Sequence, residues 1–295
     1  MVELRDLAFG YPGAGRPVLE RLTLAVPRGA FVAVVGPSGA GKSSLLRVIA
    51  GLAAPSQGAV RLLAQPAPGR RSISLVFQDP RLLPRRRVLG NVAFGLEGLG
   101  LVRTERRRRA EEAVALVGLG PLARAWPHQL SGGQQQRVGI ARALAVGPEL
   151  LLMDEPFGAL DAITREALQD ELLRPWQASG ATVVFVTHDL DEAVYLVDTV
   201  VLLAGQPARI AQRIEVATPR AQRRGAPELG FATPAKFRFG APEHHRAKRV
   251  HVPIGTPAKT KARKDKRYSV SGASIRTGHA VEHASTGPAG PEPLA

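Results

Sequence analysis

The stretch that decides the fold is Ala30-Phe31-Val32-Ala33-Val34-Val35-Gly36-Pro37-Ser38-Gly39-Ala40-Gly41-Lys42-Ser43. Its first part, Ala30 to Val35, is an uninterrupted apolar run of strand length, which predicts a buried strand. A helical pattern follows from Lys42 to Ala50. The residues between them, Gly36 to Ser43, fit the pattern G-x-x-x-x-G-K-[ST] in the strand–loop–helix setting that this pattern requires. The stretch therefore predicts a phosphate-binding loop.

Each part of the loop has a role in binding phosphate. The glycines let the backbone turn tightly and approach an anion without an intervening Cβ atom. Successive backbone N–H groups at the start of a helix then form an anion-binding nest, at the positive end of the helix dipole. We expect Lys42 to reach the β- and γ-phosphates and Ser43 to offer its hydroxyl to Mg²⁺. The ligand is thus a nucleoside triphosphate with magnesium.

Downstream of the loop, strand-like and helix-like segments alternate. Apolar runs predict strands at Leu150 to Met153, Ala181 to Thr187 and Thr199 to Leu203. Amphipathic patterns predict helices at Ala162 to Gln177 and Asp189 to Leu196. This alternation indicates an α/β fold with a mainly parallel sheet and helices on both faces.

Two segments depart from the alternation. Residues from about 81 to 146 show helical patterns and no strand, which predicts a helical subdomain inserted into the α/β domain. Beyond about residue 217, Pro, Gly, Arg, Lys and His dominate and apolar periodicity fades. Such a composition buries too little apolar surface to offset chain entropy. We therefore expect an ordered domain over 2–217 and a basic, disordered tail over 218–295.

Composition limits the classes of protein that remain. The 295 residues are 44% hydrophobic and contain no cysteine, which excludes disulfides and thiolate metal sites. No apolar run approaches the roughly 18 residues of a membrane helix, and the N-terminal residues do not resemble a signal peptide. We expect a soluble chain whose membrane role depends on a partner. Most of the net charge of +15 lies beyond Gly205, so it does not argue for nucleic-acid binding by the whole chain.

Two acids follow the apolar run at Leu150 to Met153. A strand that delivers Asp154 and Glu155 to the edge of a sheet matches the Walker B arrangement. Asp154 would hold Mg²⁺, and Glu155 would act as general base toward the attacking water. Alone, the pair would more simply cap a helix or lie on a solvated turn. Together with an upstream phosphate loop, it favours catalysis.

A third segment, Leu130-Ser131-Gly132-Gly133-Gln134-Gln135-Gln136-Arg137, resembles the signature of ABC ATPases. Its serine and glycines lie at an expected helix start, where donors and a positive dipole face an anion. The resemblance implies a P-loop NTPase core of the RecA type with an N-terminal antiparallel β portion. It also implies a homodimer in which this signature contacts the ATP bound to the other subunit.

Further motifs of the family follow in order. Gln78 resembles the Q-loop glutamine, which contacts Mg²⁺ and the attacking water, and His188 resembles the switch histidine at the γ-phosphate. Tyr11 resembles the aromatic residue that stacks on adenine, with Phe9 as the alternative. The resemblance thus implies catalytic roles for Glu155, His188 and Gln78, and metal binding by Ser43, Gln78 and Asp154. The implied contacts to ATP within one chain are Tyr11, Gly36, Pro37, Ser38, Gly39, Ala40, Gly41, Lys42, Ser43 and Ser44. Those across the dimer are Ser131, Gly132, Gly133, Gln134 and Asp161.

Three longer strings, starting at Phe77, Glu155 and Val186, resemble the nitrate, sulfonate and taurine importer ATPases. Two positions depart from the usual pattern: Arg85 stands where a tryptophan is common, and Ser44 where threonine is frequent. The resemblance implies integral membrane permease subunits that contact the region of Gln78 to Phe94, and indirectly a substrate-binding protein. The chain would lie on the cytoplasmic face of the inner membrane. The transported anion is not encoded in this chain.

Other functions stay open at this point. The chain would also fit a different ABC transporter, or an ABC ATPase that acts on nucleic acid. Relatives of the latter kind usually carry coiled coils, zinc modules or two ATPase units, none of which is present in the sequence. A nucleotide-binding scaffold is disfavoured by the presence of both Glu155 and His188. The tail could contact anionic lipid, have no function or reflect a reading-frame artefact.

Overall fold

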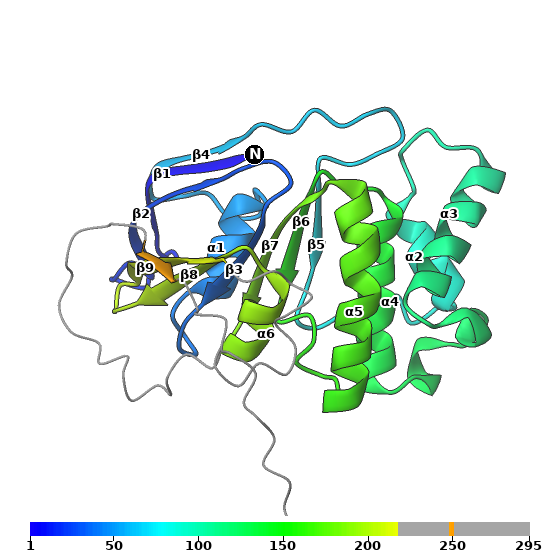
Figure 1. Ribbon diagram of the computed structural model, residues 1–295. Helices are drawn as coiled ribbons and strands as arrows, with labels where there is room; N and C mark the ends of the chain where they lie inside the picture. Colours follow the sequence, from blue (N-terminus) through cyan, green and yellow to red (C-terminus); the bar gives the residue numbers. More distant parts are fainter. Residues whose placement is uncertain (218–247, 251–295) are drawn as a thin grey trace, which may run out of the picture. The chain divides into compact units, whose positions relative to one another are not determined.

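The computed structural model describes residues 1–217 and the backbone of 248–250, apart from the side chains at 174, 175 and 177–179. A seven-stranded sheet forms its centre, in the order β10-β9-β8-β3-β7-β6-β5 (Figure 1). The central strands β8, β3, β7, β6 and β5 run parallel, whereas β9 is antiparallel to β8. Their bounds are β3 (Phe31–Val35), β5 (Ile73–Val76), β6 (Leu150–Asp154), β7 (Thr182–Thr187), β8 (Thr199–Ala204), β9 (Arg209–Val216) and β10 (Lys248–Val250). The predicted mainly parallel sheet is confirmed.

A second, antiparallel sheet is built near the N-terminus. Its order is β2-β1-β4, with β1 (Val2–Phe9) pairing on one side with β2 (Leu19–Val26) and on the other with β4 (Gln57–Leu62). This sheet is the N-terminal antiparallel portion that the resemblance implied.

Helices and loops fill the remaining segments, and α1, α5 and α6 lie within two residues of the bounds predicted for them. Residues 81–146 contain only helices and loops, which confirms the helical insertion. The helices of this subdomain are α2 (Val88–Gly95), α3 (Arg103–Leu116), α4 (Gly132–Ala145) and the 3₁₀ turns Gly120–Leu122 and Pro127–Gln129. Those of the core are α1 (Lys42–Ile49), α5 (Ala162–Ser179) and α6 (Leu190–Leu196).

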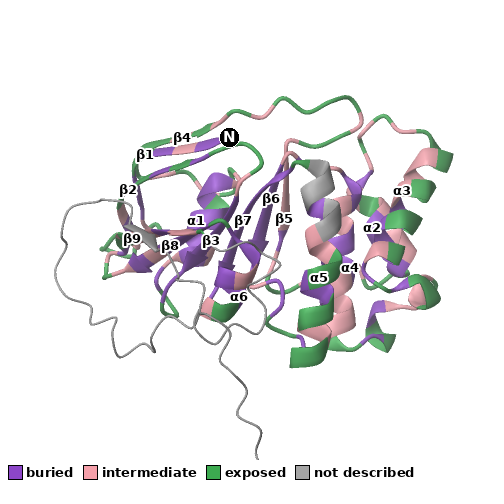
Figure 2. Cartoon of the chain, viewed as in Figure 1, coloured by how far each residue is buried: buried purple, intermediate pink, exposed green. Residues whose placement is uncertain are grey.

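The central sheet is buried on both faces, which explains its continuous apolar runs. In β3, Val32 and Val34 pack with α1 and the antiparallel sheet. The alternate residues Phe31, Ala33 and Val35 pack with α5, α6 and the helical subdomain. Figure 2 shows the resulting buried strands between partly exposed helices. Packing on both faces of the sheet holds the ends of the parallel strands in a fixed register.

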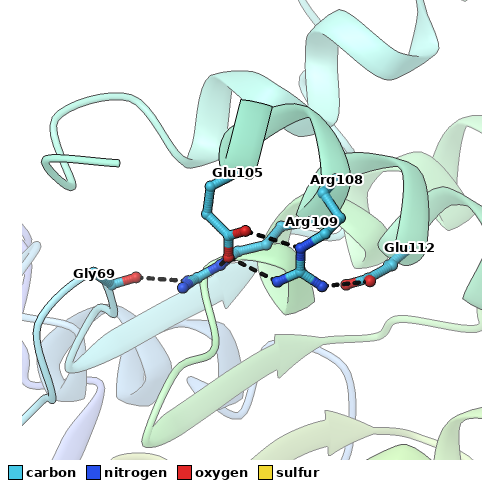
Figure 3. A network of polar contacts seen from close by, with 5 residues as sticks. All are labelled: Gly69, Glu105, Arg108, Arg109 and Glu112. Atoms are coloured by element: carbon cyan, nitrogen blue, oxygen red, sulfur yellow. Dashed lines mark hydrogen bonds and ion pairs between the residues drawn. The ribbon is translucent and has the colours of Figure 1, made fainter. Parts of the chain in front are cut away.

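The outer helix of the insertion, α3, carries a surface ion-pair network (Figure 3). Arg108 bridges Glu105 and Glu112, and Arg109 also pairs with Glu105. Hydrogen bonds from the two arginines lower the pKa of Glu105 to about 2. Arg109 Nη1 further donates to the carbonyl of Gly69 at 2.8 Å, which ties α3 to the β4–β5 connection. Exposed pairs of this kind stabilise a protein only slightly.

The predicted disorder of the tail concerns residues that mostly lie outside the described part. The exception is β10, where Lys248–Val250 pairs in parallel with Ile214–Val216 of β9. For these three residues, as for the rest of the tail, the predicted disorder stays a prediction. The predicted boundary at residue 217 stays a prediction. Among the described residues, no helix has the length and apolar character needed to cross a membrane.

Candidate functional site

The phosphate loop needs its glycines for steric reasons. A Cβ atom on Gly36 would lie 2.7 Å from the carbonyl oxygen of Leu203 in β8. Gly39 and Gly41 both have φ of 79°, a conformation that glycine adopts without strain. At Gly41 a Cβ atom would also lie 2.6 Å from Val18 Cγ1. The packing around the loop therefore admits no side chain at Gly36 or Gly41.

The ammonium group of Lys42 folds back over the loop. Its Nζ donates to the carbonyl oxygens of Gly36 at 2.9 Å and Pro37 at 3.0 Å. Burial lowers the pKa of Lys42, while the carboxylates of Glu155 and Asp154 raise it. Both hydrogen-bond partners are neutral acceptors, which bind a cation less strongly than a phosphate oxygen does. Lys42 is thus held where an anion can recruit it.

Ser43 and Asp154 meet beside the loop. Ser43 Oγ donates to Asp154 Oδ1 at 2.9 Å, and Asp154 is only 8% exposed. Burial raises the pKa of Asp154, and the hydrogen bond from Ser43 opposes that shift. A hydroxyl and a carboxylate are oxygen ligands of the kind that Mg²⁺ prefers. Within the described ranges, no group of three or more His, Cys, Asp or Glu forms a protein-only metal site. The donor set fits magnesium shared with phosphate oxygens.

The three residues predicted to be catalytic lie together. Glu155 Oε2 accepts from Gln78 Nε2 at 3.3 Å, and Glu155 Oε1 lies 3.4 Å from His188 Nδ1. Glu155 itself has φ of 44°, an unusual conformation for a residue with a side chain, and its N–H donates to Val186 O at 2.9 Å. Non-glycine residues with positive φ are uncommon, and strained backbone of this kind gathers at functional sites.

The sheet topology explains why these residues converge. β5, β6 and β7 are adjacent parallel strands, so their carboxyl ends meet at one edge. Gln78 follows β5, Glu155 follows β6 and His188 follows β7. Ligands of open α/β sheets bind at this edge. The site is a product of strand order, which the sequence motifs alone do not specify.

These residues line one cleft of about 580 Å³. Tyr11 stands at its rim, 45% exposed, and its hydroxyl lies 2.9 Å from Ser44 Oγ. Phe9 is buried and packs edge-on against Tyr11, so it supports that ring. Val18 also lines the cleft. It was not predicted, because a lone valine before a strand carries no motif. The lining residues are Tyr11, Val18, Ser38, Gly39, Gly41, Lys42, Ser43, Ser44, Gln78, Glu155 and His188.

Some predicted contacts are not part of this lining. The carbonyls of Gly36 and Pro37 accept from Lys42, and Asp154 accepts from Ser43, which lines the cleft. Ala40 is buried and its N–H closes the loop turn at the carbonyl of Pro37. The residues predicted to act across a dimer are also outside it, namely Ser131, Gly132, Gly133, Gln134 and Asp161.

Ser131 and Asp161 instead begin helices. Ser131 and Gln134 form a capping box at the start of α4, with bonds of 3.3 Å and 3.0 Å. Asp161 caps α5 by accepting from the N–H of Thr164 at 3.0 Å, and this hydrogen bond lowers the pKa of Asp161. These local roles account for both residues within one chain. Their contact with the ATP of another chain stays a prediction.

Comparisons with known proteins agree with this geometry. Residues 19–158 match the ABC transporter family. The taurine import ATP-binding protein of Pseudomonas putida is 49% identical over 217 residues, which are 73% of this chain and 83% of that protein. An uncharacterized ABC transporter ATP-binding protein of Methanocaldococcus jannaschii is 48% identical over 76% of this chain and 84% of its own.

The fold matches solved structures as well. A dimeric ATP-binding cassette in a post-hydrolysis state, bound to ADP and Pi, superposes with a TM-score of 0.66 and 33% identity. The match covers 74% of this chain and all of that one. Together with the cleft, these similarities lead to one conclusion: the chain belongs to the ABC transporter family, as one of its ATP-binding and ATP-hydrolysing proteins.

Proposed function

We propose that this chain works as a homodimer that hydrolyses ATP to drive the import of a small sulfonate, with taurine the first candidate substrate. The observation that carries the ATPase part is the convergence of Lys42, Glu155 and His188 on one cleft. The import part rests on 49% identity to a taurine import ATP-binding protein. Nitrate and other sulfonates stay as alternatives, because substrate choice lies in other subunits. The chain would bind permease subunits at the inner face of the membrane.

In this proposal, hydrolysis begins with proton transfer to Glu155. Its carboxylate accepts a proton from water that attacks the γ-phosphate, while contacts with Gln78 and His188 fix its orientation. Lys42 offsets charge that develops on the phosphoryl oxygens. Magnesium held by Ser43, Asp154 and Gln78 would supply further positive charge at the phosphates.

A second copy would complete the site. Ser131 begins α4, so its helix end presents unpaired N–H groups and a positive dipole to an anion. Because Ser131 to Gln134 and Asp161 do not line the cleft of their own chain, we assign them to the ATP of the partner. The dimeric state of the similar solved cassette supports this assignment.

The catalytic assignment is tested by Glu155→Gln, which keeps the shape of the side chain and removes the base. We expect steady-state phosphate release to fall by about 100-fold or more, with ATP binding retained. Glu111→Gln, in an exposed ion pair on α3, is the matched control and should keep wild-type turnover. Turnover of Glu155→Gln near the wild-type value would show that Glu155 is not the base.

The transport assignment is tested in cells that lack this chain. We expect the wild-type chain to restore uptake of labelled taurine and Lys42→Ala not to restore it. Tagged full-length chain should co-purify with an integral membrane protein. If the wild-type chain restored uptake of nitrate and not of taurine, nitrate would replace taurine as the proposed substrate. Co-purification with nucleic acid, and with no membrane protein, would favour the nucleic-acid function and overturn the proposal.

A further inference from the structure

The segment that carries Gln78 has no regular secondary structure of its own. Residues 77–81 follow the end of β5 and precede the helical subdomain. Its backbone groups are therefore not satisfied by a sheet or a helix and need other partners. The position of Gln78 in the cleft depends on what holds this segment.

Side chains of α4 provide that support. Gln136 Nε2 donates to the carbonyl of Phe77 at 3.2 Å, directly before Gln78. Arg142 spans two carbonyls after it, with Nη2 at 2.6 Å from Pro80 O and Nη1 at 3.1 Å from Arg81 O. The planar guanidinium suits such a fork, because its donors are fixed relative to one another.

Close packing adds to these bonds. Gly139 lies between the two polar residues on α4, and a Cβ atom on it would approach Pro80 Cβ to 3.2 Å. Helix and segment are therefore in close contact at Gly139 and Pro80. A larger side chain at Gly139 would require Pro80 to shift by a few tenths of an ångström.

The segment is also stiff internally. Arg81 has φ of 46°, and its N–H donates to Asp79 Oδ1 at 3.1 Å. Its guanidinium lies 4.5 Å from the ring centroid of Phe77, which closes the turn around Gln78. The side chain of Gln78 leaves this turn toward Glu155. A shift of the turn would thus move Gln78 relative to Glu155.

We propose that Gln136 and Arg142 are positioning residues for ATP hydrolysis: they attach the segment around Gln78 to α4, so that the helix opened by Ser131 sets the distance from Gln78 to Glu155. The proposal rests on the role of Gln78 in the proposed function. Under this proposal, the N-terminal end of α4, which carries the signature, and Gln78 in the cleft of the same chain move together.

A purely stabilising role explains Gln136 less well. Gln136 is 1% exposed, yet its Oε1 is buried and accepts no hydrogen bond from a described residue. A buried polar atom without a partner costs free energy. Gln136→Met would remove this cost together with the hydrogen bond to the Phe77 carbonyl, while keeping the length of the side chain. A loss of turnover without a loss of stability would separate positioning from stabilisation.

The experiment compares steady-state ATPase kinetics of Gln136→Met and Arg142→Lys with those of the full-length wild type. We expect kcat to fall at least about tenfold, since small misplacement of a catalytic group is costly, with the KM for ATP within about twofold. Arg71→Lys is the matched control, because Arg71 also forks over two carbonyls, at Gly95 and Glu97, away from Gln78. It should keep the wild-type kcat. The melting temperature of Gln136→Met should change little, because relief of the unpaired Oε1 offsets the lost bond to the Phe77 carbonyl.

Combination with Gln78→Ala gives the decisive measurement. If Arg142 acts through Gln78, Gln78→Ala with Arg142→Lys will have the same kcat as Gln78→Ala alone. Multiplied losses in the double variant, wild-type kcat in both single variants, or an equal loss in Arg71→Lys would each overturn the inference. Full activity of Gln78→Ala would refute the role of Gln78 in the proposed function, and the inference with it. Impaired Gln78→Ala beside active positioning variants would refute the inference alone.

Discussion

At the residue scale, the cleft depends on backbone conformations that few residue types tolerate. Glu155 holds a positive φ, and the packing around Gly36 and Gly41 leaves no room for a Cβ atom. Strain at Glu155 is balanced by its backbone bond to Val186 and by the contacts of its carboxylate. The sheet thus fixes the direction of the base before ATP arrives, which is the preorganisation that catalysis needs.

Tyr11 is the residue on which adenine stacking is expected to depend. Tyr11→Ala should raise the KM for ATP about tenfold, since stacking on an aromatic ring is worth about 1–3 kcal/mol per base. Tyr11→Phe keeps the ring and loses only the contact with Ser44, so its KM should stay near the wild-type value. Steady-state kinetics measure both. A larger rise in KM for Phe9→Leu than for Tyr11→Ala would instead assign the stacking to Phe9.

Glu192 gives a pH dependence of stability. It is 8% exposed and accepts from Gln169 Nε2 at 3.1 Å, and burial raises its pKa. Between the ordinary and the raised pKa, the folded state binds more protons than the unfolded state, so stability falls as pH rises through that window. Glu192→Gln should flatten this fall.

The measurement for Glu192 is the urea midpoint at constant ionic strength from about pH 4 to pH 8. The urea midpoint of Glu192→Gln should increase relative to that of the wild type as pH rises. Glu171→Gln, at an exposed position of α5, should keep the wild-type slope. Equal slopes for wild type and Glu192→Gln would contradict the expected contribution of this carboxyl.

At the element scale, the order of strands and helices was predictable because each signal is local. The apolar run of β3, the glycines after it and the signature before α4 each occupy a few consecutive residues. The supports of the site are not local. Gln136 and Phe77 are 59 positions apart, and Arg142 and Pro80 are 62 apart. No periodicity or motif joins such pairs, so the fold and most site residues were predictable and their supports were not.

Asn91 is a local support within the helical subdomain, with partners at most eight positions away. It is fully buried on α2, accepts from Leu83 N at 2.7 Å and donates to carbonyls of Leu83 and Arg86. Asn91→Ala leaves these part-buried groups without the partner they have in Asn91 and should lower the free energy of unfolding by about 3 kcal/mol. Urea denaturation measures the loss. Gln129→Ala, which removes one exposed bond to Trp126 N, should cost about 0.5–1 kcal/mol, and a similar cost for Asn91→Ala would contradict the argument.

At the scale of the whole molecule, the proposed function has one chain hold two halves of different ATP sites. Lys42, Glu155 and His188 line its own cleft, whereas Ser131 lies outside it. The antiparallel sheet and α1 pack on one face of the central sheet, and the helical subdomain belongs to the apolar cluster on the other face. A chain built in this way is expected to need a second copy for turnover, because neither half alone surrounds the phosphate.

Mixing two inactive variants tests this composite arrangement. In a mixed dimer of Lys42→Ala and Ser131→Arg chains, one site receives both substitutions and the other receives none. We therefore expect each variant alone to be inactive, and an equal mixture to regain up to about one quarter of wild-type ATPase activity, since half of the dimers are mixed and each has one intact site. Phosphate release after co-incubation with ATP measures the recovery. The same mixture made with Lys42→Ala and Glu155→Gln, both in the cleft of one chain, is the control: each site of its mixed dimer carries one lesion, so no activity should return. An inactive mixture of the first pair, with both variants folded, would place Ser131 and Lys42 at the same site and refute the proposed dimer.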